Sequence, residues 1–143
     1  MALNAQSDVG IELWKSATGI TAWTKLIDVT AIPATGAPQA KIETTVLSSP
    51  VKQYIADRED LPDMEFTYNY TEANFTSALA SCSTPTYFMI VYGDGSGAVI
   101  YGEANTWHDA VGRGQAVEAK LNIVPQSVEF KTIAEVTALK AAV

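Results

Sequence analysis

The chain has 143 residues, enough for one domain with an ordinary apolar core. Sixteen acidic against nine basic residues give a net charge of −7, which argues against a surface that holds nucleic acid by neutralising phosphates. The single Cys82 excludes an intramolecular disulfide, and no stretch of 18 residues is apolar enough to predict a membrane span.

The first half of the chain predicts strands joined by long polar connections. A strand is expected over residues 25–31, followed by a loop with Pro and Gly over 32–38 and a second strand over 39–47. Ser48-Ser49-Pro50 is typical of a helix start, so residues 51–56 are expected to form a short helical turn.

Alternating polarity predicts the strands of the second half. Apolar residues occupy every second position in 64–70 and in 117–123, as in strands with one buried and one solvated face. Residues 87–92 are apolar on both faces, which predicts a central strand covered on each side. The glycine-rich loop 93–97 predicts a β-hairpin over about 86–107.

One helix is predicted clearly, over residues 72–81, with Phe75, Ala78 and Leu79 on its inner face. Residues 132–143 are compatible either with a short helix or with an arm docked elsewhere. The expected architecture is therefore a mainly β domain of about seven strands, with one helix packed on a sheet face.

The chain contains no pattern typical of a catalytic or metal site, and no enzymatic activity is predicted. His108 is the only histidine and is interpreted as a surface or rim residue, and Cys82 as a small buried thiol. Five acids between Asp57 and Glu65 could offer oxygens to a cation, but no glycine marks the sharp turn of a calcium loop and Pro62 stiffens the segment. A solvated or partner-facing loop is the preferred interpretation.

A small β-rich domain with long loops and extended ends has strand edges that another chain can cover. This composition favours a self-assembling protein, although it also suits a carbohydrate-binding or adaptor module.

Two stretches carry a more specific likeness. Residues 39–49 contain Ile42-Glu43-Thr44-Thr45-Val46-Leu47 after a Pro/Gly loop, and residues 63–70 read Asp-Met-Glu-Phe-Thr-Tyr-Asn-Tyr. A tyrosine-bearing turn and an acidic stretch lie between them. In this order the motifs resemble the major tail tube proteins of long, non-contractile-tailed bacteriophages (siphophages), and the likeness extends in pattern over about residues 20–130.

The resemblance implies a phage tail tube fold: two packed antiparallel sheets, a β-sandwich or split barrel, with one flanking helix. It implies a single tail-tube domain over residues 1–143, with an N-terminal arm (1–10), a long inter-ring loop (48–63) and a C-terminal segment (131–143). Such proteins form hexameric rings stacked into a hollow tube, through which DNA passes into the host without specific binding. Six acidic copies, each at −7, would repel the phosphates rather than hold them.

The same resemblance implies the partners and the location. The partners are other copies of the chain and the tape-measure, tail-tip and tail-terminator proteins, and no cofactor or metal is expected. The protein is expected in the tail of the virion, assembled in the cytoplasm of the bacterial host.

Two sets of surface residues follow from the resemblance. The loop 48–63 maps onto the segment that reaches the neighbouring ring, and its candidate contacts are Lys52, Tyr54, Arg58, Glu59, Asp60 and Leu61. The polar strand faces supply the candidates for the lumen: Glu43, Glu118 and Lys120.

Two alternatives stay open. One is another tube-forming homologue, such as a type VI secretion-like tube or a tail-tip protein. The other is a monomeric β-sandwich module that binds glycans, although Trp14, Trp23 and Trp107 are separated in sequence rather than clustered.

Overall fold

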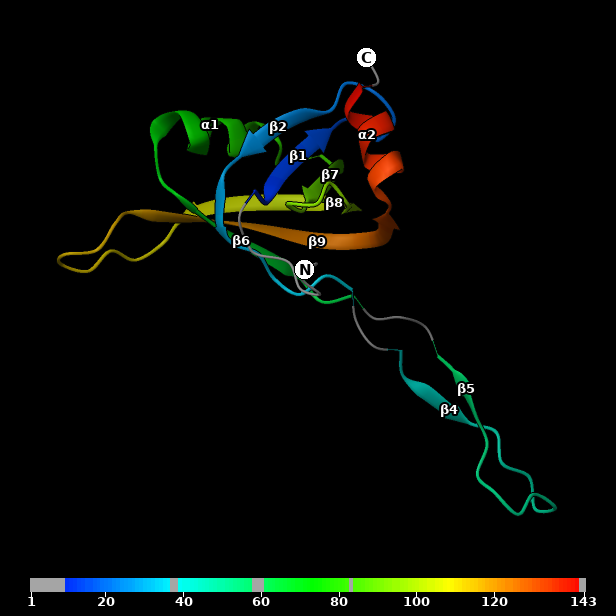
Figure 1. Ribbon diagram of the computed structural model, residues 1–143. Helices are drawn as coiled ribbons and strands as arrows, with labels where there is room; N and C mark the ends of the chain where they lie inside the picture. The colour runs from blue at the N-terminus through cyan, green and yellow to red at the C-terminus, as the bar shows by residue number, and fades with distance from the viewer. Residues whose placement is uncertain (1–9, 37–38, 58–60, 83, 142–143) are drawn as a thin grey trace, which may run out of the picture.

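The computed structural model describes residues 10–36, 39–57, 61–82 and 84–141. Within these residues the chain forms nine strands and two helices (Figure 1). In chain order they are β1 (Glu12–Ser16), β2 (Thr24–Ile27), β3 (Val29–Ala31), β4 (Lys41–Glu43), β5 (Tyr54–Ala56), β6 (Met64–Asn69), α1 (Glu72–Ala80), β7 (Thr86–Val91), β8 (Gly97–His108), β9 (Glu118–Lys131) and α2 (Ile133–Ala141).

Seven strands form one antiparallel sheet in the order β2-β1-β7-β8-β9-β6-β3, and β4 pairs with β5 in a separate two-stranded sheet. Only Asp28 separates β2 from β3, yet these two strands lie at opposite ends of the seven-stranded order. The sheet must therefore curl until its two edges meet at Asp28, which makes a split barrel.

The barrel interior is the main core. Its buried side chains alternate along the strands, as the sequence pattern predicts: Met64, Phe66 and Tyr68 from β6, and Ala119, Leu121 and Ile123 from β9. β6 and β9 pair in register over these residues, with Phe66 opposite Leu121. Side chains that face one another across the sheet thus fill the same layer of the core.

β7 is the central strand that the doubly apolar pattern predicts. Phe88 and Ile90 point into the barrel, whereas Met89 and Val91 pack on the outside against Val136 of α2. All four side chains are buried, so this strand is covered on both faces.

The mainly antiparallel β class is confirmed, with corrections. The expected two sheets are two halves of one continuous sheet, because β8 and β9 are long enough, at 12 and 14 residues, to run through both halves. There are two flanking helices rather than one, since α2 forms after Thr132, whose Oγ1 accepts a hydrogen bond from the Glu135 N–H. Leu79, expected on the inner face of α1, is exposed, and Ala78 is the buried residue of that helix.

The prediction of a helical turn over residues 51–56 is wrong, because part of that segment is β5. Its partner strand β4 is nearby in sequence and supplies ladder hydrogen bonds, with Ile42 opposite Ile55. Ser49 does not cap a helix; its Oγ donates to the Val51 carbonyl oxygen at 2.6 Å, inside the turn of a hairpin. A Ser-Ser-Pro sequence fits a hairpin tip as well as a helix start, and the neighbouring strand decides between them.

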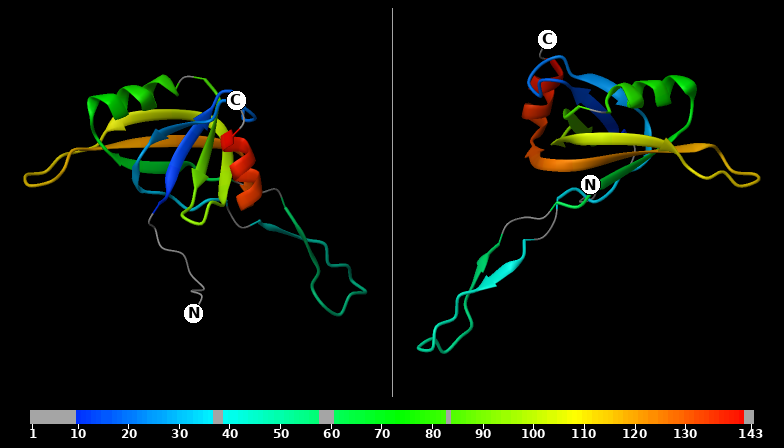
Figure 2. Two further views of the ribbon diagram at one scale, coloured as in Figure 1. Left: turned by 45° about the horizontal axis from the view of Figure 1, so that its top comes forward. Right: turned by 180° about the vertical axis from the view of Figure 1, so that it is seen from behind.

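Two hairpins extend from the barrel on opposite sides, as both views of Figure 2 show. The longer contains β4 and β5, and we call residues 39–57 the arm. The shorter is the loop between β8 and β9, residues 109–117, which we call the β8–β9 loop. In the described part of the chain, no helix is long and apolar enough to cross a bilayer.

Candidate assembly surfaces

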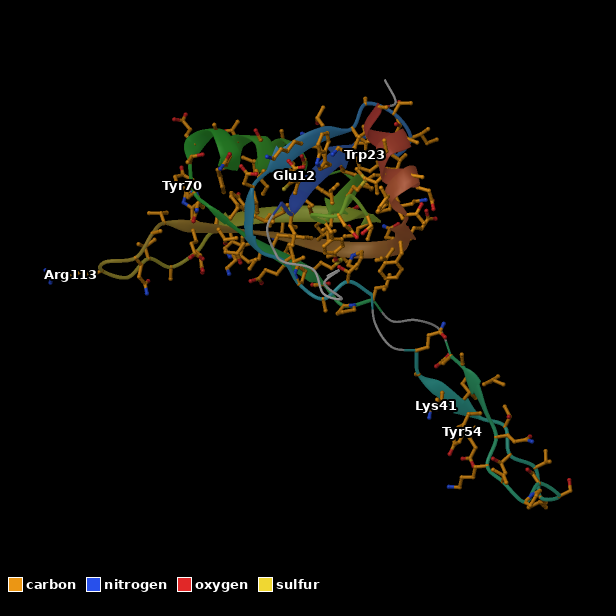
Figure 3. All side chains as sticks on the ribbon, viewed as in Figure 1. Glu12, Trp23, Lys41, Tyr54, Tyr70 and Arg113 are labelled. Carbon is orange, nitrogen blue, oxygen red and sulfur yellow. The ribbon has the colours of Figure 1, made fainter. Side chains whose placement is uncertain are left out.

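The arm is held together by its own backbone. Beyond the paired β4 and β5, the Thr44 N–H donates to the Gln53 carbonyl at 2.9 Å, and the Asp57 N–H donates to the Ala40 carbonyl at 2.7 Å. The Lys41 ammonium lies 5.3 Å from the centre of the Tyr54 ring, a cation–π contact visible in Figure 3. An isolated two-stranded hairpin of this kind is marginally stable in water, so a second surface is expected to support it.

The arm exposes apolar side chains along its whole length. Register places Ile42 and Ile55 opposite one another, and therefore on the same face of the arm. The six exposed apolar or aromatic side chains of the arm are Ile42, Val46, Leu47, Val51, Tyr54 and Ile55. Leu47, near the tip, is as exposed as in an unfolded chain. So many apolar side chains on one projecting element indicate a contact with another molecule.

The outer side of the sheet formed by β6, β9 and β8 is polar. Register places Asn122 of β9 between Glu65 of β6 and Asn105 of β8, so these three side chains point to the same side. One step along the strands, Lys120 lies between Thr67 and Trp107. We call this outer side of the three strands the polar face.

Lys120 binds the centre of the polar face together. Its Nζ donates to Thr67 Oγ1 at 2.8 Å, and lies 3.6 Å from Glu65 Oε1 and 3.9 Å from Asp109 Oδ2. The Lys120 side chain is mostly covered, whereas both carboxylate side chains are about half exposed. Lys120 therefore links β9, β6 and the start of the β8–β9 loop, on a surface that also carries acidic side chains.

An aromatic cluster fixes the base of the β8–β9 loop. The His108 ring makes edge contacts with Tyr70 and with Phe75, at 4.4 Å between ring centres in each case. Tyr70 follows β6 and Phe75 belongs to α1, so three elements meet at this point. His108 is exposed, as expected for a rim residue, and its role here is packing.

α2 covers the outer side of β1, β7 and β8. The side chains on this part of the sheet are mainly apolar, in contrast to those of the polar face. Val136 is buried against Trp23 and Met89, and Lys140 Nζ lies 4.7 Å from the centre of the Trp14 ring. The indole N–H groups of Trp14 and Trp23 are buried without a hydrogen-bond partner under this helix. The two indoles beneath α2 are thus held by packing and by the Lys140 contact, and their N–H groups make no hydrogen bond.

A groove of about 680 Å³ lies at the seam of the barrel, between the start of β1 and the segment from Asp28 to Ile32. At its rim Lys25 Nζ lies 2.7 Å from Asp28 Oδ1 and 3.2 Å from Glu12 Oε2. The hydrogen bond to Asp28, and then the one to Glu12, raise the pKa of Lys25 above its usual value. These charges tie β1 and β2 together at the place where the two sheet edges meet.

Two observations on the described residues bear on metal binding and on thiol chemistry. Among them, no three His, Cys, Asp or Glu side chains are close enough to hold a metal ion. Burial raises the pKa of the Cys82 thiol, and its Sγ lies 3.3 Å from the Ala78 carbonyl oxygen. The thiol is therefore in its protonated form at neutral pH, which suits the packing role expected for it.

Comparisons at the level of sequence identify no relative: no family model matches the chain, and no curated protein is similar to it. Solved structures do match it in fold. A chain of the anti-feeding prophage (AFP) baseplate, determined by cryo-EM with 6-fold symmetrisation, superposes with a TM-score of 0.64 at 12% identity, covering 93% of this chain and 99% of that one. A chain from the tail of an empty GTA particle, of C6 symmetry, gives a TM-score of 0.62 at 11% identity, covering 90% of this chain and all of that one. The chain has a tail-tube-like fold.

The predicted inter-ring contacts are distributed within this tail-tube-like fold as follows. Lys52 and Tyr54 lie on the return limb of the arm and are exposed, and Leu61 lies half-buried between the arm and β6. Arg58, Glu59 and Asp60 lie outside the described residues.

The predicted lumen residues fall on two different surfaces. Glu118 and Lys120 lie on β9 and belong to the polar face, whereas Glu43 lies on β4 in the arm. The structure therefore brings two of the three together. Sequence reasoning did not include Glu65 and Glu103 in this set, although the alternation over residues 64–70 already places Glu65 on the solvated side of its strand.

Proposed function

We propose that this chain is a structural subunit of a hollow tail tube, in which six copies form a ring and rings stack on one another. The observation that carries the proposal is the fold match, which covers at least nine tenths of this chain and of two chains taken from tail and baseplate particles with 6-fold symmetry. The role is one of assembly rather than of catalysis. The exposed apolar side chains of the arm support it, because in a monomer they would remain in contact with water.

The polar face is the surface that we assign to the lumen. Its acids are Glu65, Glu103, Glu118 and Glu129, and its bases are Lys120 and Lys131, so it has a net negative charge. A water-filled channel needs a polar lining. Acids along it repel DNA phosphates, so that the genome slides without being held.

The arm is the element that we assign to contact between rings, with Lys52 and Tyr54 as its charged and aromatic contributions. On this proposal the particle is a siphophage virion, which delivers its DNA into the host through the tube. The remaining partners are the tape-measure, tail-tip and tail-terminator proteins, and the tail is assembled in the cytoplasm of the bacterial host. The motif in residues 39–70 supports the siphophage assignment.

A position at the distal end of a tail is the second candidate, because one of the two matching chains comes from a baseplate. A subunit that only starts a tube forms a ring without stacking further. A glycan-binding module is a weaker candidate, since Trp14 and Trp23 pack under α2 and do not form an exposed aromatic platform.

The test is negative-stain electron microscopy of the purified protein at rising concentration, with light scattering on the same samples. Rings or hollow tubes with sixfold end views are the expected result. Single rings that never stack favour the second candidate. Leu47→Asp is expected to reduce stacking because it puts a charge at the arm tip, whereas Ile20→Asp, at an exposed turn of the body, is the matched control and is expected to leave stacking unchanged. A protein that stays monomeric at all concentrations, also with a preformed tail tip as initiator, contradicts the proposal.

A further inference from the structure

The arm and the β8–β9 loop lie on opposite sides of the barrel. Figure 3 shows this with Lys41 and Tyr54 on the arm and Arg113 at the tip of the β8–β9 loop. When copies stack in the same orientation, each contact joins one surface of a copy to a different surface of the next. If the chain stacks as proposed above, the arm of one copy therefore approaches the β8–β9 side of its neighbour.

Both hairpins are long enough to overlap. From Ala40 to Leu47 the arm spans about 23 Å, and from Asp109 to Arg113 the β8–β9 loop spans about 13 Å, at about 3.3 Å per residue. An arm that passes the tip of the loop thus reaches its base, where β8 and β9 begin to pair and the Asp109 N–H donates to the Glu118 carbonyl.

The two hairpins expose apolar side chains that can cover one another. The tip of the arm exposes Val46, Leu47 and Val51. The β8–β9 side exposes Trp107, Val111 and Val117, at 37, 52 and 42%. All six side chains keep more than a third of their surface exposed, so contact between the sets removes apolar surface of both from water.

The charges run in complementary order along the two hairpins. On the arm, the base Lys52 lies near the tip, and the acid Glu43 lies further back, opposite Tyr54. On the β8–β9 loop the order is reversed, with the base Arg113 at the tip and the acids Asp109 and Glu118 at its foot. When the hairpins overlap tip to foot, Lys52 meets the acids and Arg113 meets Glu43. The spacing differs by a few ångströms, which the long Lys and Arg side chains can span.

We propose that the receptor for the arm is the β8–β9 loop of a second copy, with the apolar tip of the arm against Trp107, Val111 and Val117. Lys52 then pairs with Glu118, and Arg113 pairs with Glu43. Glu118 is the acid chosen for Lys52, because Asp109 already lies 3.9 Å from Lys120 of its own copy. This inference rests on the proposed stacking and adds the surface on which the arm docks. Trp107 and Glu118 lie at the end of the polar face that adjoins the β8–β9 loop, so the arm covers that end and leaves Glu65 and Glu103 to the lumen.

A second apolar surface competes for the arm. Phe130 and Ile133 are exposed where β9 ends and α2 begins, on the side of the barrel from which the arm leaves. An arm that docked there on a second copy would bring like sides of two copies together. Such a contact closes a two-fold pair and does not propagate, which a stacked tube requires.

The first experiment is a charge-reversal cycle read out as the critical concentration for assembly, measured by light scattering and electron microscopy. Lys52→Glu and Glu118→Lys are each expected to raise the critical concentration at least fivefold, and the double variant is expected to return within twofold of the wild type. Lys52→Glu combined with Glu103→Lys is the matched control, because it restores the same net charge at a site away from the loop. Equal rescue by both doubles, or no effect of the single variants, overturns the proposal.

The second experiment identifies the receptor directly. In a Cys82→Ser background, Leu47→Cys is combined either with Val111→Cys or with Phe130→Cys, and the assembled protein is oxidised. The first pair is expected to give a ladder of covalent multimers on a non-reducing gel, and the second pair none. Cross-linked dimers from the Phe130→Cys pair overturn the proposal even where tubes form. Assembly of the wild type is followed in parallel by sedimentation. If the proposed function is wrong, neither the wild type nor any variant assembles; if only the receptor is wrong, the wild type assembles and the cross-links differ.

Discussion

Gly102 lies in β8 at the bulge opposite Pro125 of β9, and an added side chain there collides with backbone. A Cβ built on Gly102 lies 2.1 Å from the carbonyl oxygen of Val124 and 3.1 Å from the Cα of Pro125. Because these are backbone atoms, no rotamer change can make room, and β8 must move away from β9. These strands share the largest interface of the barrel and carry the polar face.

Gly102→Ala is therefore expected to destabilise the fold by about 2–4 kcal/mol, from overpacking together with one or two weakened ladder hydrogen bonds. The free energy of unfolding is measured by urea titration followed by circular dichroism. Gly114→Ala is the matched control: Gly114 has φ +79 but no atom within 4 Å of the added Cβ, so it reports the cost of a left-handed conformation alone, about 1–2 kcal/mol. A Gly102→Ala protein as stable as the wild type would refute the reasoning.

Three smaller perturbations test other parts of the structure. Val136→Ala is expected to cost about 2 kcal/mol, because it removes buried methyl groups that hold α2 on the sheet, and to shift tryptophan fluorescence to the red. Tyr68→Phe is expected to cost about 1 kcal/mol in urea titration, since it removes the 2.8 Å hydrogen bond to Thr106. Lys25→Met is expected to reduce the loss of stability at alkaline pH: the ion pair with Asp28 raises the pKa of Lys25, so its contribution is present below about 10.4 and is lost as the pH rises through the raised pKa.

Each of these three predictions has a control or an outcome that would contradict it. Ile133→Ala, at an exposed position of α2, is expected to leave the fluorescence unchanged, and an equal red shift from it would show that α2 does not cover the indoles. For Tyr68, a loss above about 3 kcal/mol would mean that the ring packing, not the hydroxyl, had been disturbed. For Lys25, identical alkaline unfolding curves for wild type and variant would show that the ion pair does not contribute to the stability of the seam.

The local pattern predicted the elements that depend on neighbours in sequence. The alternation over residues 64–70 and 117–123 gave β6 and the start of β9, and the glycine-rich loop gave the β7–β8 hairpin. Thr71 was a sound signal for the start of α1, because its Oγ1 accepts from the Asn74 N–H at 3.1 Å. These features rest on backbone geometry and side-chain period, which any segment carries with it.

The candidate surfaces were predicted only in part. Lys52 and Tyr54 do lie on an exposed projecting segment, but the apolar character of the arm appears only when Ile42 and Ile55 are seen paired and uncovered. Glu118 and Lys120 share a face because they are two residues apart on one strand. Glu43 was grouped with them because a polar residue at a strand position gives the same sequence pattern in the arm as in the barrel.

The sequence by itself thus determined the class of the fold, its central strand and its first helix. Only the tertiary structure decided that the sheet closes at Asp28, that β4 and β5 leave the barrel as an arm, and that α2 covers the outer side of β7. The physical reason is that the side-chain period of a strand is local, whereas its partner, its place in the sheet order and the side of the sheet that stays in water depend on residues far away in the chain.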